Sequence, residues 1–246
     1  MRSPANLAKH IRKLLRDYGS PDHAAGVQRF FKEEVRSHGW RAADLRKAAL
    51  RMRRAVLAHA GPDYLLQVAD KLFRGRVVEE KAMAVLLLEK SRPEFGEREF
   101  RLLESWLDRV SNWDDHDALV HMLLGPMLVA NPRRAHLALG WAKSKNRWRR
   151  RAAAVVFIRG ARKEMFQREI RQVANSLLKD GDEMVQKGLG WLLREWAKQS
   201  PVRALPYLLR IRARAPRLVL RTACEKLTTA QRAQVLAKRQ LVASSW

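Results

Sequence analysis

The chain has 246 residues, 47% of them hydrophobic, which is enough to bury a substantial core and excludes global disorder. It carries 50 Lys and Arg against 25 Asp and Glu, a formal net charge of +25, which favours a polyanionic partner. No apolar run approaches the roughly 20 residues that cross a bilayer, and one cysteine excludes an internal disulfide framework and fits a reducing cytoplasm.

The pattern of apolar residues predicts helices from one end of the chain to the other. Residues 1–19 carry charges throughout and lack the apolar core of a secretory signal. Apolar residues then recur at spacings of three and four over residues 77–90, 98–110 and 185–198, as in amphipathic helices. Gly and Pro breakers interrupt the pattern about every 12 to 20 residues, and sustained two-residue alternation is lacking. We therefore expect an all-α chain of many short helices.

A charged residue followed by a small one recurs with a period in the mid-thirties. The successive spacings are 34, 36, 34, 36 and 34 residues. Two helices per period of this length are typical of an α-solenoid of HEAT-like, armadillo-type repeats, here about six helix pairs. Each small residue would let a neighbouring helix approach closely, and the charged residues would line one face. The six charged positions are Lys47, Lys81, Asp117, Arg151, Lys187 and Arg221.

One of these positions, Asp117, is acidic and lies in the stretch SNWDDHD. One interpretation is a structural ion pair with Arg151 of the next repeat. The other is a functional carboxylate, because Trp113 lies one helical turn before Asp117 on the same face. Trp191 likewise lies one turn after Lys187. Spacing alone leaves both interpretations open.

Three segments carry the motifs of a known family. The segment NWDDHD resembles W-D-x-x-D, residues 146–157 (NRWRRRAAAVVF) resemble N-x-W-x-x-R-x-A, and residues 186–198 (QKGLGWLLREWAK) resemble Q-K-x-x-G-W-x-L-R-E-x-A-K. These are the motifs of the AlkD-like alkylpurine DNA glycosylases, which are built from HEAT-like repeats. A weaker likeness at residues 29–32 and 39–46 extends the resemblance over most of the chain.

The resemblance implies a monofunctional DNA repair glycosylase, a hydrolase of the N-glycosidic bond in duplex DNA. Its substrates would be positively charged alkylated purines such as N3-methyladenine and N7-methylguanine. It places the catalytic aspartate at Asp117 and the active-site tryptophans at Trp113 and Trp191. A carboxylate stabilises an oxocarbenium-like sugar, and indole faces attract cations. The resemblance also implies that the base is not flipped into a pocket.

The resemblance places the family's DNA-contacting arginine at Arg151. A basic cluster opens the predicted helix of this residue, and helix starts offer backbone N–H groups to phosphates. The residues expected to bind DNA are Arg151, Arg147, Arg149, Arg150, Lys187, Arg194, Lys47 and Lys81. The chain departs from the family in three places. Phe30 stands where relatives tend to carry tyrosine, His116 replaces an apolar residue beside Asp117, and residues 39–46 lack an expected proline.

The other polar residues of SNWDDHD suggest supporting roles. We expect Asp114 to complement the start of a helix and Asp115 to project into solvent. The spacing of His116 and His121 is poor for one helical face, so we expect neither a metal nor another cofactor. Cys224 lies in an apolar helix and is expected in the core.

Two other functions remain as alternatives. A non-catalytic HEAT-repeat protein could bind DNA structures through the same basic face, and a protein-binding adaptor would need a strongly acidic partner. Our first expectation is a cytoplasmic monomer that acts on double-stranded DNA containing alkylated purines. It would form one domain over residues 1–241, with residues 242–246 as a frayed tail.

Overall fold

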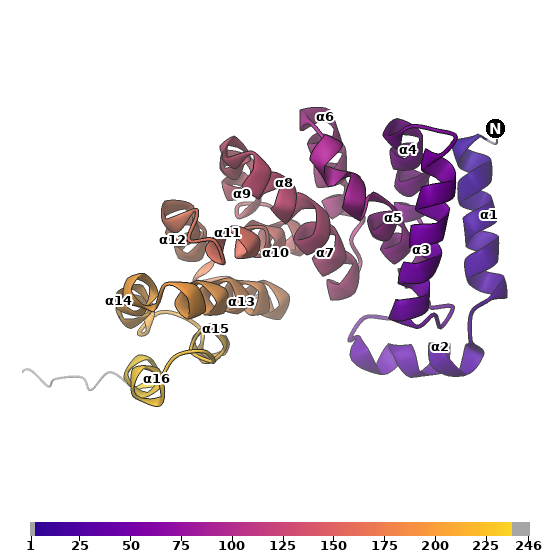
Figure 1. Cartoon of the computed structure of the whole chain (residues 1–246). Coiled ribbons are helices and arrows are strands. Elements are labelled where there is room, and N and C mark those ends of the chain that lie inside the picture. The colour runs from indigo at the N-terminus through magenta and orange to yellow at the C-terminus, as the bar shows by residue number, and fades with distance from the viewer. Residues whose placement is uncertain (1–2, 238–246) are drawn as a thin grey trace, which may run out of the picture. The chain divides into compact units, whose positions relative to one another are not determined.

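The structure, a computed structural model, describes residues 3–237, the side chain of Arg92 excepted (Figure 1). Over this range the chain forms helices and no strand, and one isolated parallel bridge joins Arg36 to Val77. The all-α fold predicted from the sequence is confirmed. None of the helices in the described range is long and apolar enough to cross a membrane. The expected tail, residues 242–246, lies outside the described residues.

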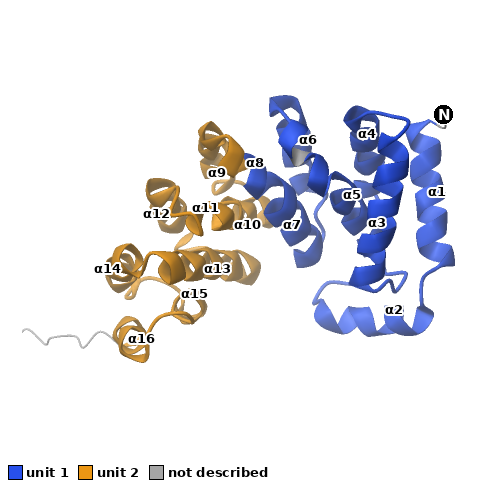
Figure 2. Cartoon of the chain, viewed as in Figure 1, with its two compact units in different colours: residues 1–127 blue, residues 128–246 orange. Residues whose placement is uncertain are grey.

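The chain divides into two compact units, residues 1–127 and residues 128–246 (Figure 2). Each unit has its own set of packed helices. The expectation of a single domain over residues 1–241 stays a prediction.

Unit 1 begins with α1, which Ser3 caps by accepting a hydrogen bond from the amide of Asn6. The helix α2 lies crosswise to α1 and α3 (Figure 1). The predicted helix over residues 77–90 is α5, and the one over residues 98–110 is α6 continued by η3. The elements are α1 (Pro4–Asp17), α2 (Pro21–Val27), η1 (Gln28–Phe30), α3 (Ala42–Leu57), α4 (Pro62–Phe73), α5 (Val78–Leu88), η2 (Glu89–Glu94), α6 (Glu97–Ser105), η3 (Trp106–Arg109), α7 (Trp113–Leu119) and η4 (Val120–Leu124).

The helix α8 (Gly125–Ala130) contains the boundary between the units. In unit 2 the predicted helix over residues 185–198 is α13, and the basic cluster opens α10. The elements are η5 (Pro132–Arg134), α9 (Ala135–Trp141), α10 (Arg147–Val155), α11 (Ile158–Ala161), α12 (Gln167–Leu177), α13 (Glu183–Gln199), α14 (Pro201–Ile211), α15 (Arg217–Ala223) and α16 (Thr229–Leu236).

Each period of the repeat places its charged position on one helix. The six charged positions lie in α3, α5, α7, α10, α13 and α15. In unit 1 α5 packs against both α3 and α7, and in unit 2 α13 packs against both α10 and α15. Small residues permit this: a Cβ on Gly188 would lie 3.0 Å from Arg151 Cγ, and one on Gly190 would lie 2.8 Å from Thr222 Cβ. The close approach expected from the small residues is therefore present between these helices.

Large aromatic side chains fill the space between the helices of each unit. In unit 1 the rings of Trp106 and Phe73 stack with centroids 4.4 Å apart, and Trp106 Nε1 donates to Asp70 Oδ1 at 2.9 Å. In unit 2 Trp196 lies 5.5 Å from Tyr207. Both tryptophans are fully buried, so each contributes a large apolar area to its core.

The loop between η1 and α3, residues 31–41, is fixed by a buried carboxylate of α5. Glu79 accepts hydrogen bonds from Ser37 Oγ at 2.6 Å and from the backbone amide of Gly39 at 2.9 Å. Gly39 has φ +78°, and a Cβ there would lie 2.0 Å from the carbonyl oxygen of Ser20, so glycine is required. This η1–α3 loop is thereby held in place beside the start of α7.

Candidate functional site

The stretch SNWDDHD forms the start of α7 in unit 1. Asn112 is the N-cap: its Oδ1 accepts hydrogen bonds from the amides of Asp114 at 3.0 Å and Asp115 at 2.9 Å. Two carboxylates in the first turn complement the positive end of the helix dipole. The helix start thus holds Trp113 and Asp117 at defined positions one turn apart.

Trp113 is held by the η1–α3 loop. Its Nε1 donates to the carbonyl oxygen of Phe30 at 3.2 Å, and its ring stacks on Phe31 with centroids 5.2 Å apart and an interplanar angle of 19°. The indole is half-buried, while the side chain of Phe30 is exposed. The backbone of Phe30, rather than its side chain, therefore orients the tryptophan.

Asp117 keeps part of its carboxylate in contact with solvent. Its side chain is 22% exposed, and Oδ1 lies 2.6 Å from Nδ1 of His116, whose side chain is fully buried. The carboxylate of Asp117 is therefore in direct contact with a buried imidazole. The arrangement leaves a carboxylate that a ligand can reach but that cannot turn freely.

Asp115 is buried, so the expectation that it projects into solvent is wrong. Its Oδ2 lies 2.7 Å from Nζ of Lys81 on α5, and both side chains are at most 4% exposed. The ammonium also donates to the carbonyl of Arg109 at 2.7 Å and to Ser111 Oγ at 3.1 Å. These acceptors use the hydrogen-bonding capacity of the ammonium. Lys81 is buried in unit 1 and so does not belong to an exposed basic row. The stretch SNWDDHD thus contributes a buried ion pair to the core of unit 1.

Asp114 carries an unusual carboxyl group. Burial, as the largest cause, together with the negative charges of Asp115, Asp117 and Glu79, raises its pKa to about 6. An ordinary aspartate has a pKa near 3.8. The start of α7 therefore combines one carboxyl group that titrates near neutrality with a second one that is partly exposed.

In unit 2 the basic cluster at the start of α10 is divided between protein contacts and the surface. Arg150 Nε lies 2.6 Å from Asp180 Oδ2, and Arg147 Nη1 lies 3.6 Å from Asp182 Oδ2. Arg151 is only 5% exposed and donates to the carbonyl of Met184 at 2.7 Å. These three guanidinium groups connect α10 to the segment that starts α13.

Three further predicted residues of unit 2 lie on α13. Lys187 pairs with Glu183 one turn earlier at 2.9 Å, and Arg194 Nη1 lies 2.8 Å from Glu225. Trp191 is half-buried on the same helix. Lys187 and Arg194 keep partly exposed side chains, so a further anion can still approach them.

The two predicted residues not yet placed are Lys47 and Arg149. In unit 1 Lys47 is exposed on α3 and lies 3.7 Å from Asp44. In unit 2 Arg149 is partly exposed on α10. Of the two, Lys47 is the one whose side chain is mostly exposed and open to a polyanion.

Sequence reasoning considered an ion pair between neighbouring repeats for Asp117 alone and missed two others, although a signal was present. Lys81 and Asp115 are 34 residues apart, which is the repeat period itself. Arg162 and Glu195, 33 residues apart, form a comparable pair at 2.8 Å. Opposite charges separated by one period predict such pairs, because equivalent positions of adjacent repeats lie side by side. Cys224 is buried, as expected.

Comparisons with known proteins agree with the motifs. The family model of the DNA alkylation repair enzyme matches residues 11–227. A solved structure of a predicted DNA alkylation repair enzyme from Enterococcus faecalis is similar with a TM-score of 0.77, covering 86% of this chain and 97% of that one at 16% identity. AlkD2 from Streptococcus mutans is similar with a TM-score of 0.59, covering 83% and 97% at 19% identity. At these identities the structural likeness establishes the shared fold.

No curated protein matches the chain significantly. Since the family model spans most of the sequence, the chain belongs to the family of DNA alkylation repair enzymes, as its AlkD-like motifs predicted.

Proposed function

We propose that the protein is a DNA glycosylase that hydrolyses the N-glycosidic bond of positively charged alkylated purines in duplex DNA. The observation that carries the proposal is Asp117, a carboxylate that is partly exposed and oriented by a buried imidazole. Trp113 lies one helical turn away on the same helix. Membership of the DNA alkylation repair family supports the reaction class.

The reaction needs stabilisation of a sugar that becomes positively charged. As the C1′–N bond breaks, both electrons leave with the base, and a cationic alkylated purine departs as a neutral molecule. The carboxylate of Asp117 would stabilise the cationic sugar electrostatically and orient the water that attacks C1′ and then loses its proton. The indole face of Trp113 favours the same positive charge, and we assign the same role to Trp191 of unit 2.

No general acid is required in this scheme, because the alkylated base is already a good leaving group. One carboxylate therefore suffices, without a cofactor. The base need not enter a deep pocket, and recognition would depend on the charged sugar and on the DNA backbone. We propose a monomer in the cytoplasm, in keeping with a single buried cysteine.

The proposed contacts to DNA are unequal. Lys47, Arg149 and Lys187 keep exposed or partly exposed side chains that can reach phosphates. Arg150 and Arg151 already bind protein acceptors, so we assign them mainly to holding α10. Lys81 is assigned to the interior of unit 1.

The test is release of base from methylated duplex DNA by the wild type and by Asp117→Asn. Asn is nearly isosteric but uncharged, and loss of a preorganised electrostatic contact costs about 2.7–4 kcal/mol, or roughly a hundred- to a thousandfold in rate. Asp22→Asn makes the same chemical change at another helix start and should release base at the wild-type rate. Unchanged release by Asp117→Asn would contradict the mechanism. Tight binding of DNA with no release by the wild type would instead favour a non-catalytic DNA-binding protein.

A further inference from the structure

Unit 1 contains an open depression of about 440 Å³ that the proposed chemistry does not use. Three segments converge on it: the η1–α3 loop, the connection between α4 and α5, and the residues just before α7. We call it the arginine pocket. Its lining residues are Glu34, Arg36, Arg74, Gly75, Arg76, Lys81, Arg109 and Ser111.

The walls of the arginine pocket are fixed by hydrogen bonds of the backbone and of buried groups. The carbonyl of Arg36 accepts a hydrogen bond from the amide of Val78 at 3.0 Å, which ties the η1–α3 loop to the start of α5. On the other side Lys81 binds the carbonyl of Arg109 and the hydroxyl of Ser111. The pocket is therefore formed before any ligand arrives, which lowers the entropic cost of binding.

The charges of the arginine pocket do not cancel. Arg74 and Arg109 share one carboxylate, that of Asp70, at 2.9 Å and 2.6 Å. Arg36 and Arg76 are exposed and form no ion pair with any residue that the structure describes. Glu34 is the one acidic residue of the lining. Since Lys81 is neutralised by a buried partner, a surplus of positive charge remains on the four arginines.

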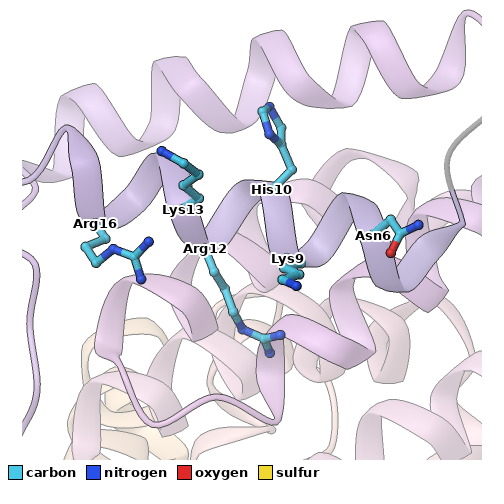
Figure 3. A pocket seen from close by; sticks show the side chains of 6 residues that line it. All are labelled: Asn6, Lys9, His10, Arg12, Lys13 and Arg16. Carbon is cyan, nitrogen blue, oxygen red and sulfur yellow. The ribbon is translucent and has the colours of Figure 1, made fainter.

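A second basic depression lies along α1, and its geometry differs (Figure 3). All of its lining residues come from one helix. Figure 3 shows His10 and Lys13 on one side of the helix and Arg12 on the other. Arg12 binds Glu80 at 2.8 Å, and Lys13 pairs with Asp17. Cations that diverge and are already paired do not form a binding site, so the arginine pocket is the stronger candidate.

The chemistry of the arginine pocket fits a phosphate group. Guanidinium groups present a planar set of donors that matches phosphate oxygens in two-point contacts. The pocket lies beside the candidate active site: Ser111 of its wall is two residues before Trp113, and the loop that carries Arg36 also carries Phe31, which stacks on Trp113. A polyanion that reaches Trp113 can therefore reach the pocket as well.

We propose that the arginine pocket binds a backbone phosphate of the duplex DNA whose lesion nucleotide faces Asp117. The proposal rests on the proposed function for the identity of the ligand. It adds a contact that is separate from the basic residues on α10 and α13. The pocket would fix the distance between the bound phosphate and the carboxylate of Asp117, and so would position the DNA on unit 1.

The experiment measures affinity for undamaged duplex DNA as a function of salt. Arg36→Gln combined with Arg76→Gln should lower the magnitude of the slope of log K against log [salt] by at least about 0.9, the value for one phosphate. Equivalently, the loss of affinity between 50 and 200 mM salt should become smaller by about threefold. The matched control, Arg98→Gln with Arg101→Gln, removes the same charge from exposed positions of α6 and should leave the slope within error of wild type.

A second variant moves affinity in the opposite direction. Glu34→Gln removes the one acidic residue of the lining and should tighten binding of the same duplex several-fold. If the double arginine variant keeps the wild-type slope, or shifts it no more than the control pair does, the pocket does not hold a phosphate. No step of the assay needs base release. A protein that releases no base but shows these shifts would overturn the proposed glycosylase activity and leave the pocket standing.

Discussion

Nδ1 of His116 lies 2.6 Å from Oδ1 of Asp117, so a fully buried ring holds one oxygen of a partly exposed carboxylate. A carboxylate accepts, so Nδ1 is the nitrogen that donates, and the neutral ring would carry its proton there. The histidine stands where the family resemblance predicts an apolar residue. We therefore propose that it positions the carboxylate of Asp117.

The role of His116 can be separated from simple packing. In His116→Asn the amide nitrogen stands near the place of Nδ1 and can still donate to Asp117, whereas in His116→Gln the donor is displaced towards the place of Nε2. We expect the Asn variant to release base within a few-fold of the wild-type rate. The Gln variant should lose about tenfold to a hundredfold in single-turnover rate, because small misplacement of a catalytic group is costly. Equal losses in both variants would assign the histidine to packing alone.

The buried pair of Lys81 and Asp115 should be a large contributor to the stability of unit 1. Lys81→Met leaves a buried carboxylate without its cation, which costs about 3–5 kcal/mol in the free energy of unfolding. Lys13→Met breaks the exposed pair with Asp17 and should cost less than about 1 kcal/mol. Urea unfolding of both variants measures the difference. Similar midpoints would show that the pair is not buried in solution.

The carboxyl group of Asp114 predicts a pH dependence of stability. Its folded pKa of about 6 lies above the ordinary 3.8, so between these values the folded state binds more protons than the unfolded state. Its contribution to stability is therefore greatest below about pH 4, falls as the pH rises to about 6, and stays unfavourable above. Asp114→Asn should stabilise the protein at pH 8 by on the order of 1–3 kcal/mol and have little effect near pH 4. A constant difference across this range would contradict the raised pKa.

Arg150 of α10 and Lys187 of α13 should behave differently. Arg150 binds Asp180 at 2.6 Å and the carbonyls of Ser144 and Lys145 at 3.0 and 2.9 Å, so Arg150→Gln should cost about 2 kcal/mol of stability. Lys187→Gln breaks one exposed pair with Glu183, so it should change stability less and reduce the salt dependence of DNA binding more. Thermal unfolding and salt titration of the two single variants provide the test. A larger salt effect from Arg150 would reverse the assignment.

The sequence predicted the helices more completely than the side-chain partners, for a physical reason. The apolar spacing over residues 77–90 is a local property, and it produced α5 at Val78–Leu88. The burial of Asp115 depends on a lysine 34 residues away, so it follows only once adjacent repeats are paired. The six charged positions lie on helices, as predicted. They do not all face solvent, because Arg151 points inward to the carbonyl of Met184. Motif resemblance selected Trp113 and Asp117 from a short segment, and their catalytic roles stay predictions.

The carboxylate of Glu79 accepts hydrogen bonds from the backbone amides of His38, Gly39 and Trp40 at 3.0, 2.9 and 3.2 Å. These amides belong to a connection between helices, where exchange with solvent deuterium is ordinarily fast. Here their exchange requires that the loop separate from α5, an opening of the packed unit rather than a nanosecond loop fluctuation. We therefore expect protection that lasts as long as that of α5 itself. The wall beside Trp113 is then a rigid edge, and a duplex bound there as proposed would have to change its own shape to fit.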